Sequence, residues 1–464
     1  MKNDLRIFAS IAEGLVDDEI THPVSEYIPV EKLSETFDIS LNDGPIDDQE
    51  FEEILSDLVL KTPKTASKMF FNQLFGGRKS KAVLGDLLAV MLNNSMYTYK
   101  AAGPQIAIEK EIIRQTCRLI GYGEDSNGII APGGSLSNFM ALIMARDVFD
   151  PKIREKGMSR GLKMYTSVES HYSNKKNATF AGIGTDNVRY VDADAFGRMI
   201  PEHLDRLISE DIENGFSPFF VNATAGTTVL GAYDPIDEIS AICKAHKLWF
   251  HVDGVYGGAV LFSDKYKHLI KGIEKTDSVS INAHKMLGTP LTCSFILTRH
   301  NQCLHHSFSS EAEYLYQTDG DDFNPGKISL QCGRRNDALK LWCLWKSVGT
   351  KGLAEIVEKQ FALADAARNY IRSNPDYRLY SFDESVSVCF NYKNIPADLL
   401  CSMLYEKSEI MVGYGNFNND EFIRLVTVNS ENSTDDILMF FKKLEDFVEE
   451  NRNHLIPKSN SMFS

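Results

Sequence analysis

An acidic and a basic side chain follow two successive apolar segments near the middle of the chain. Asp253 comes at the end of LWFHVDG, and Lys285 comes just beyond DSVSINA. A buried carboxylate needs a partner, and an amine held in a desolvated pocket is the group that condenses with carbonyl ligands. Alone, Asp253 is better explained as the cap of a turn. As a pair, the two residues suit pyridoxal phosphate, because lysine can take its aldehyde and aspartate can pair with its pyridine nitrogen.

Two further segments could complete such a site. In APGGSLSNFMALIMAR, Gly133 and Gly134 open a predicted helix, where backbone N–H groups are free to bind a phosphate. In SHYSNKK, His171 begins another helix, and an imidazole can stack on an aromatic ring. Each feature alone is more often structural, so both gain meaning only beside Asp253 and Lys285.

The elements that position these residues alternate between short apolar strands and helices from about residue 127. The candidate strands are GLKMYTSV, NVRYVDAD, SPFFVNAT, LWFHVDG, DSVSINA and CSFILTRH. Such alternation predicts an α/β fold with a mostly parallel sheet flanked by helices. Ligands of these sheets bind at the carboxyl ends of the strands, which is where Asp253 and Lys285 fall.

Composition shifts along the chain predict three parts. Residues 1–95 form an N-terminal segment that packs on the large domain, and residues 96–345 form that domain. Residues 346–464 form a small α+β domain with strands YRLYSF, SVSVCFNY and FIRLVTVN and an amphipathic helix near 434–450.

The overall composition excludes several classes of function. The 464 residues include 49 Lys and Arg against 64 Asp and Glu, and the net charge of −15 opposes binding to nucleic acid or an anionic membrane. No segment has the roughly 18 apolar residues of a membrane span, and the start lacks the apolar stretch of a secretory signal. The eight cysteines form no CxxC pair, which favours free thiols in the cytoplasm and predicts no metal site.

In this order, the phosphate turn, the histidine, the aspartate and the lysine resemble the group II pyridoxal-phosphate decarboxylases, in particular the animal glutamate and cysteine sulfinate decarboxylases. The resemblance runs from about residue 63 to 450, through FFNQL, YTYKAAGPQIAIEKE, APGGSLSN, SHYSNKK, GIGTDNV, FVNATAGTTVLGAYDPI, LWFHVDGVYGG, NAHKMLG and LQCGRRND. It implies the PLP-dependent transferase-like fold (aspartate aminotransferase fold type I), with a mostly parallel seven-stranded sheet. It also implies a homodimer whose active sites lie at the subunit interface.

The resemblance assigns roles around the cofactor. Lys285 would bond to the aldehyde, Asp253 would pair with the pyridine nitrogen, and His171 would stack on the ring and handle protons. The phosphate and the ring edge would be held by Gly134, Ser135, Asn282, His284 and Thr224.

The resemblance also assigns residues to the substrate. Arg424, in FIRLVTVN, would grip a substrate carboxylate together with Gln73, in FFNQL. The planar fork of arginine suits a carboxylate or sulfinate. We therefore expect a local reversal of the chain's negative charge, made by Lys285, Arg424, His171 and His284.

The identity of the substrate depends on two residues of NNSMYTYK. Ser95 and Tyr97 match cysteine sulfinate decarboxylases, whereas glutamate decarboxylases tend to have Asn and Phe there. The extra hydroxyl of Tyr97 narrows the pocket and offers a hydrogen bond to a shorter acidic side chain. This favours cysteine sulfinate, aspartate or cysteate over glutamate. The expected reaction is α-decarboxylation of a small acidic L-amino acid to an amine and carbon dioxide.

Three departures from the family pattern leave alternatives open. Val255 follows Asp253-Gly254 where the family has alanine, so its side chain would press on the cofactor, and Ala283 replaces the usual proline before His284. The loop before LQCGRR has no tyrosine between Tyr316 and Gln331, although in the family this loop usually supplies a tyrosine that reprotonates the intermediate. The loss of this tyrosine leaves open a decarboxylation coupled to oxidative deamination, which yields an aldehyde. A second alternative is that the protein is not an enzyme but a non-catalytic relative that keeps the fold.

Overall fold

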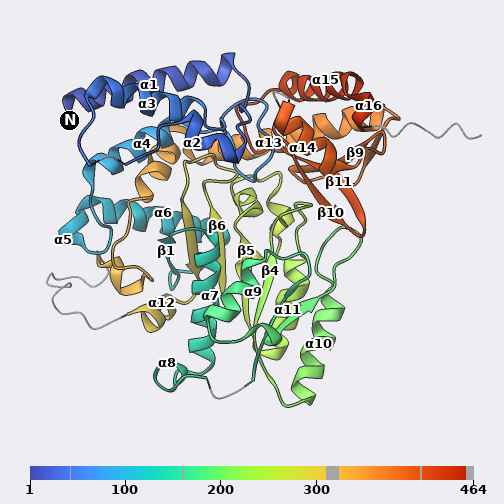
Figure 1. Ribbon diagram of the computed structural model, residues 1–464. Coiled ribbons are helices and arrows are strands. Elements are labelled where there is room, and N and C mark those ends of the chain that lie inside the picture. The colour runs from blue at the N-terminus through green and yellow to red at the C-terminus, as the bar shows by residue number, and fades with distance from the viewer. Residues whose placement is uncertain (42, 159–160, 310–322, 408–409, 456–464) are drawn as a thin grey trace, which may run out of the picture. The chain divides into compact units, whose positions relative to one another are not determined.

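The computed structural model describes residues 1–41, 43–158, 161–309, 323–407 and 410–455. The chain divides into two compact units (Figure 1). The first unit comprises Met1–Gly77, Leu363–Tyr380 and Ser387–Ser464, and the second comprises Arg78–Ala362 and Ser381–Val386. The boundaries that the sequence suggests at residues 95 and 345 stay predictions.

The second unit is built on a seven-stranded sheet. In spatial order its strands are β1 (Asn127–Ala131), β7 (Ser294–Thr298), β6 (Ser278–Asn282), β5 (Trp249–Gly254), β4 (Ser217–Thr224), β2 (Leu162–Ser167) and β3 (Val188–Val191). Only β7 runs against its neighbours in this sheet, so the other strands share one direction. Their carboxyl ends therefore meet at one edge, and the mostly parallel seven-stranded sheet that we predicted is confirmed.

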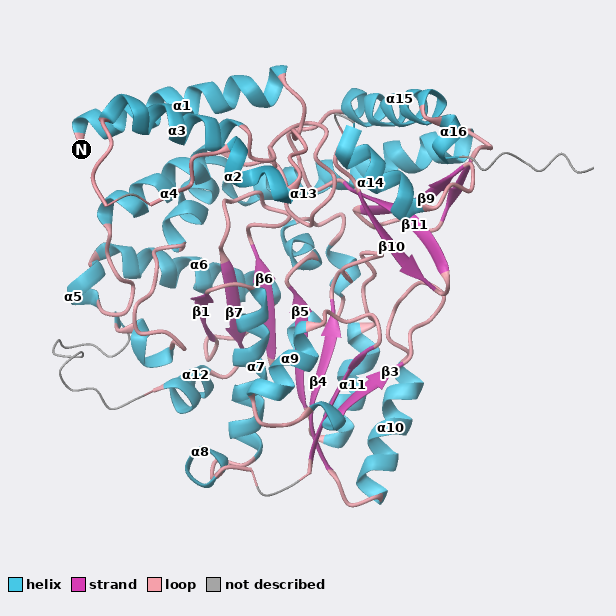
Figure 2. Ribbon diagram, viewed as in Figure 1, coloured by secondary structure: helices cyan, strands magenta, loops and turns pink. Residues whose placement is uncertain are grey.

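Helices cover this sheet, whose central strands are buried along their whole length, as expected for a sheet enclosed on both faces. Figure 2 shows α7 and α9 crossing in front of the strands. Almost every residue from Ser137 to Ala145 of α7 is buried, so this helix is apolar on nearly all sides. The helices of this unit are α4 (Ser80–Leu92), α5 (Tyr99–Ala102), α6 (Pro104–Ile120), α7 (Gly134–Phe149), α8 (Ile153–Lys156), α9 (Ser173–Phe180), α10 (Pro201–Glu213), α11 (Ile236–His246) and α12 (Asn301–Phe308), with the first part of α13 (Ala338–Ser373).

The first unit contains a four-stranded antiparallel sheet. Its strands lie in the order β10 (Gly413–Phe417), β11 (Asp420–Val426), β9 (Ser387–Tyr392) and β8 (Tyr377–Leu379). Its helices are α1 (Lys2–Thr21), α2 (Leu33–Thr36), α3 (Asp48–Leu60), α14 (Ala397–Lys407), α15 (Thr434–Glu450) and α16 (Arg452–Leu455). A capping box of Ser433 and Asp436 starts α15, whose Phe440 and Phe441 pack against Phe390 of the sheet.

Two strands were not predicted from the sequence. β1 is a short segment directly before the glycine turn, and β10 is a half-exposed strand whose letters GYGNF contain no apolar run. Both lie at sheet edges, but for different reasons they lack an apolar run: β10 is half-exposed, whereas β1 is buried and only five residues long. Within the part of the chain that the structure describes, no helix combines the length and apolarity that crossing a bilayer requires.

Candidate active site

Three neighbouring strands bring their polar ends together. Thr224 ends β4, Asp253 lies next to the end of β5, and Asn282 ends β6. The ladder pairs Thr224 with Asp253, and Asp253 with Ser280 of β6. Parallel register therefore sets these side chains next to one another, and Lys285 follows in the loop after β6.

Asp253 is almost fully buried and is held by two neutral donors. Asn138 of α7 donates from Nδ2 to Oδ2 at 2.7 Å, and the backbone N–H of Val255 donates to Oδ1 at 3.1 Å. Among the described residues Asp253 forms no ion pair. The carboxylate is thus oriented without being neutralised, which leaves it able to pair with a cationic group of a ligand.

Lys285 and His171 lie near this carboxylate. Lys285 is half-buried, and its Nζ lies 5.7 Å from the ring centre of Tyr256. Burial lowers the pKa of His171, and the charge of Lys285 lowers it further, while the charge of Asp253 opposes both effects. His171 Nδ1 accepts the backbone N–H of Ser173 at 3.2 Å, so the neutral ring carries its proton on Nε2.

The start of α7 is shaped by a missing side chain. A Cβ on Gly134 would lie 2.7 Å and 2.8 Å from the two methyl groups of Val255 and 3.1 Å from Asn282 Nδ2. Val255 therefore packs over the start of the helix. The absence of a side chain at Gly134 leaves the space for Val255, which is larger than the alanine usual in the family. Ser135 follows, and its carbonyl accepts a hydrogen bond from Asn177 at 2.9 Å.

Two buried polar atoms of the site have no partner among the described residues. They are Thr224 Oγ1 and Asn282 Oδ1. Buried polar atoms are nearly always hydrogen-bonded, so such atoms at the carboxyl edge of the sheet fit a bound polar ligand. With the N–H groups at the start of α7, the amine of Lys285 and the carboxylate of Asp253, the donor set fits pyridoxal phosphate.

His284 immediately precedes Lys285, and hydrogen bonds fix both nitrogens of its ring. Cys293 donates its backbone N–H to His284 Nδ1 at 2.9 Å, and Asn282 Nδ2 lies 3.1 Å from Nε2. Burial, and to a lesser degree Lys285, lowers the pKa of His284 to about 4. The expected charge reversal is therefore wrong in part, because His171 and His284 are both neutral at pH 7.

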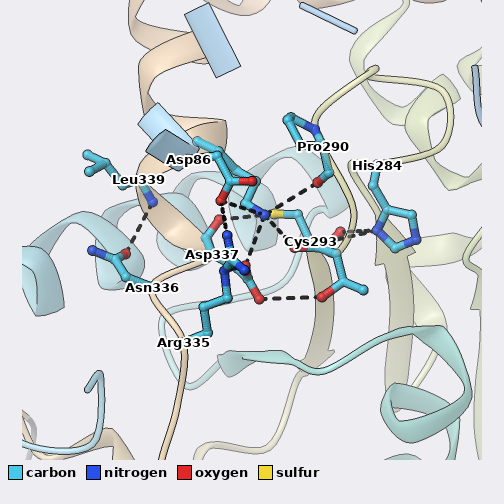
Figure 3. A network of polar contacts seen from close by, with 10 residues as sticks. Asp86, His284, Pro290, Cys293, Arg335, Asn336, Asp337 and Leu339 are labelled. Atoms are coloured by element: carbon cyan, nitrogen blue, oxygen red, sulfur yellow. Dashed lines mark hydrogen bonds and ion pairs between the residues drawn. The ribbon is translucent and has the colours of Figure 1, made fainter. Parts of the chain in front are cut away.

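A cluster of charged residues stands behind His284 (Figure 3). The fully buried Lys340 lies 3.0 Å from carboxylate oxygens of both Asp86 and Asp337, and it donates to the Thr292 carbonyl at 3.0 Å. Arg335 adds a second cation at 2.6 Å from Asp86. This network, which we call the Lys340 cluster, holds the far end of the loop that carries Lys285.

The two residues assigned to the substrate carboxylate lie in the first unit. Arg424 is on β11, and its Nη2 donates to the Asn72 carbonyl at 3.0 Å. Gln73 is the next residue and is exposed. The structure thus brings Arg424 and Gln73 near each other within that unit, and their roles stay predictions.

Ser95 and Tyr97 lie in the second unit, in the segment before α5. Ser95 Oγ accepts the N–H of Arg334 at 3.1 Å, and the Tyr97 carbonyl accepts the N–H of Gly326 at 2.9 Å. No described hydrogen bond joins either residue to Lys285. The loop to which the missing tyrosine was assigned includes residues 310–322, which lie outside the described residues.

Sequence reasoning overlooked Asn138 and His251. Both are buried, and His251 Nε2 lies 3.0 Å from Asn138 Oδ1, behind the bond from Asn138 to Asp253. A signal was present, because His251 precedes Asp253 by two positions and so lies on the same face of β5.

Comparison with known proteins identifies the family. The model of the pyridoxal-dependent decarboxylase conserved domain matches residues 32–393. The chain is 36% identical to human acidic amino acid decarboxylase GADL1 over 446 residues, which is 90% of this chain and 85% of that protein. It is 36% identical to mouse cysteine sulfinic acid decarboxylase over 463 residues, which is 93% of this chain and 94% of that protein.

Solved structures agree with this result. The crystal structure of mouse CSAD matches with a TM-score of 0.90 at 35% identity, and the match covers 95% of this chain and 97% of that chain. The crystal structure of Oryza sativa TDC with PLP and tryptamine matches with a TM-score of 0.89 at 22% identity over 97% and 99% of the two chains, which supports the fold alone. The resemblance read from the sequence is confirmed, and the chain belongs to the pyridoxal-dependent decarboxylase family as an amino-acid decarboxylase that uses pyridoxal phosphate.

Proposed function

We propose that the substrate is a small acidic L-amino acid, which loses its α-carboxylate as carbon dioxide. The observation that carries this proposal is the full-length similarity to mouse cysteine sulfinic acid decarboxylase, at 36% identity over 94% of that protein. Human acidic amino acid decarboxylase GADL1, equally similar, supports the same substrate class. Arg424, whose guanidinium is anchored at the Asn72 carbonyl, is the residue we propose for the substrate carboxylate.

Within this class, we propose a preference for three-carbon acids over glutamate. Ser95 and Tyr97 are the residues expected in cysteine sulfinate decarboxylases. The hydroxyl of Ser95 is fixed by the N–H of Arg334, and Arg334 is itself buried and bonded to Glu109. This segment is therefore rigid enough for one added hydroxyl to discriminate between side chains of different length.

The geometry of the site supports the roles proposed for its residues. When bound, pyridoxal phosphate supplies an aldehyde for the substrate amine and a ring that accepts electrons from the breaking bond. Lys285 would hold the aldehyde from a half-buried position, and Asp253 would hold the ring nitrogen with a carboxylate whose two oxygens are already oriented. The neutral His171 keeps a proton on Nε2, so this atom can donate it.

We further propose a homodimer in the cytoplasm. Helix α4 exposes a row of large apolar side chains, and soluble monomers rarely leave such a patch uncovered. These residues are Leu84, Leu87, Leu88, Val90, Met91 and Leu92. All eight cysteines are free thiols, in keeping with a reducing compartment. A solution mass equal to one chain of 52.1 kDa would contradict the dimer.

A panel of L-amino acids tests the substrate and the outcome together. We expect the highest kcat/KM for cysteine sulfinate, aspartate or cysteate, with glutamate at least about tenfold lower, since one methylene in a pocket is worth about 1–3 kcal/mol. Carbon dioxide should form without hydrogen peroxide. A rate on glutamate equal to the others would reject the three-carbon preference.

The same panel addresses the two alternatives. Neither is supported by the relatives, whose names describe decarboxylases. Peroxide formed in step with carbon dioxide would instead establish the oxidative outcome. A colourless protein that binds no added pyridoxal phosphate, and that borohydride leaves unlabelled at Lys285, would establish a non-catalytic relative.

A further inference from the structure

A row of buried, hydrogen-bonded side chains, which we call the file, extends from Asp253 into the interior of the second unit. Its members are Asp253, Asn138, His251, Ser278 and Trp249. Trp249, His251 and Asp253 alternate along β5, so all three point to the same face of the sheet. Ser278 is the register partner of His251 on β6, and Asn138 reaches this face from α7. Each of the five side chains is at least nine-tenths buried, so water cannot replace their mutual hydrogen bonds.

The hydrogen bonds of this file run in one direction. Asn138 Nδ2 must face Asp253 because only the NH₂ group can donate to a carboxylate, so Asn138 Oδ1 faces His251 Nε2 at 3.0 Å. Nε2 must then carry the proton. Ser280 Oγ lies 3.4 Å from the same Nε2 and makes a second, longer contact.

The other side of the imidazole fits the same direction. Burial lowers the pKa of His251 to about 3, so the ring is neutral and Nδ1 is an acceptor. Ser278 Oγ lies 2.9 Å from Nδ1 and can donate its proton, since it accepts a hydrogen bond from Trp249 Nε1 at 2.9 Å. Each donor in the file therefore has an acceptor, and the order runs from Trp249 through Ser278, His251 and Asn138 to Asp253.

We propose that His251 and Asn138 are positioning residues that force Asp253 to act as a fixed, hydrogen-bonded anion toward the pyridine nitrogen of the cofactor. Without the proton on His251 Nε2, the amide of Asn138 could turn over. Its oxygen would then face the carboxylate of Asp253 and repel it. With that proton in place, Asn138 can only donate.

The consequence concerns the proton shared between Asp253 and the ring nitrogen. Hydrogen bonds to a carboxylate stabilise its charged form. Held in this way, Asp253 would accept a hydrogen bond from a protonated ring nitrogen, and that proton would strengthen the ring as an acceptor of electrons. The inference depends on the role proposed above for Asp253 but not on the identity of the substrate, so it is tested on the holoenzyme without substrate.

The test uses pyridoxal phosphate labelled with ¹⁵N in its ring and a matched pair of variants. His251→Leu removes the hydrogen bonds of the imidazole to Asn138 and Ser278, whereas His251→Gln keeps a donor toward Asn138. In His251→Leu we expect the ring nitrogen shift to move toward the unprotonated value and the cofactor to bind about tenfold more weakly, as for one lost hydrogen bond to a charged group. His251→Gln should restore both readouts to within about threefold of the parent. Parent values of both readouts in His251→Leu would overturn the proposal.

Two further variants keep the test decisive. Ser278→Ala removes only a hydroxyl and frees the imidazole to move its proton to Nδ1, so it should cause a smaller change in the same direction. If His251→Leu does not fold, an unchanged nitrogen shift in Ser278→Ala would overturn the proposal. Asp253→Asn separates the two levels of inference. If Asp253→Asn leaves the ring nitrogen protonated, the role proposed for Asp253 is wrong. If Asp253→Asn is the only variant that moves the ring nitrogen shift, the role of Asp253 stands and only the positioning role of His251 and Asn138 is wrong.

Discussion

Asp253 and the two carboxylates of the Lys340 cluster, all in the second unit, differ in how their charge is balanced. Asp253 accepts hydrogen bonds from two neutral donors, Asn138 and the backbone of Val255. In the Lys340 cluster, by contrast, Asp86 and Asp337 both lie 3.0 Å from the ammonium group of Lys340. The carboxylate of Asp253 is oriented by neutral donors and has no counter-ion among the described residues. The carboxylates of Asp86 and Asp337 are paired with a cation of the protein itself.

The difference separates the carboxylate that we propose for a ligand from carboxylates that stabilise the fold. An ion pair already formed in the interior has little to offer a bound molecule, and breaking it leaves an uncompensated charge. A carboxylate held only by neutral donors keeps its attraction for a ligand cation. Burial alone would rank Asp253 and Asp337 alike, since both are 5% exposed. The identity of the partners distinguishes them.

The strongest test of this comparison is Asp253→Asn. We expect kcat/KM to fall about a thousandfold, because a charge pair at about 4 Å with an effective dielectric of about 20 is worth about 4 kcal/mol. The thermal midpoint of the cofactor-free protein should change little, since no ion pair within the described residues is broken. Steady-state kinetics, and thermal unfolding of the same preparation freed of cofactor, check both halves. Activity within tenfold of the parent would remove the distinction drawn for Asp253.

The converse substitution is Lys340→Met, which keeps the volume and removes the charge. It leaves Asp337 and the partly exposed Asp86 with only Arg335, whose side chain is 53% exposed, as a cation, so we expect a loss of about 3 kcal/mol in the free energy of unfolding. Urea unfolding of the holoenzyme measures this loss. The ring nitrogen shift of bound cofactor in the folded fraction should stay at the parent value.

A matched control is available in the same cluster. Arg335 also contacts Asp86, but its side chain is 53% exposed. Arg335→Gln should therefore cost about 1 kcal/mol or less, as exposed ion pairs usually do. Equal losses for Arg335→Gln and Lys340→Met would show that burial of the cation is not what makes this cluster structural.

Much of this arrangement could be predicted from the sequence, and the parts that could not share a physical reason. Asp253, Lys285 and the glycine turn stand directly after apolar runs, so strand periodicity and the topology of parallel sheets place them at one edge. Asn138 and His251 lie inside a helix and a strand, where a polar residue among apolar ones gives no sign of its partner. Their pairing depends on how α7 crosses β5, which is a property of packing and not of spacing.

The same limit applies to charge. The sequence counts His171 and His284 as potential cations, because an exposed histidine titrates near neutral pH. Only burial in the folded chain shows that both are neutral. Arg424 and Gln73, which were matched to the family by their motifs, are neighbours through Asn72. A contact of this kind joins segments far apart in the chain, so it is invisible to local patterns.

A further expected effect is on the dependence of stability on pH. Burial lowers the pKa of His251 to about 3 and that of His284 to about 4, from an ordinary value of 6.5. The unfolded chain therefore binds protons that the folded chain does not. The stability that these groups contribute is complete above about pH 6.5 and is lost as the pH falls toward 4 and 3, by up to about 1.4 kcal/mol per pH unit for each.

His251→Gln removes one titrating group while keeping a donor toward Asn138, so it isolates this contribution. Between about pH 4.5 and 6, where an unfolded histidine is mostly protonated, the urea midpoint of the variant should fall less steeply with decreasing pH than that of the parent. His268→Gln, at an exposed site, is the control for removing a histidine from the surface. His284→Gln should flatten the curve as well, because burial also lowers the pKa of His284. Parallel curves for all four proteins would mean that neither histidine is held neutral by the fold, and the one-way order of hydrogen bonds behind Asp253 would lose its basis.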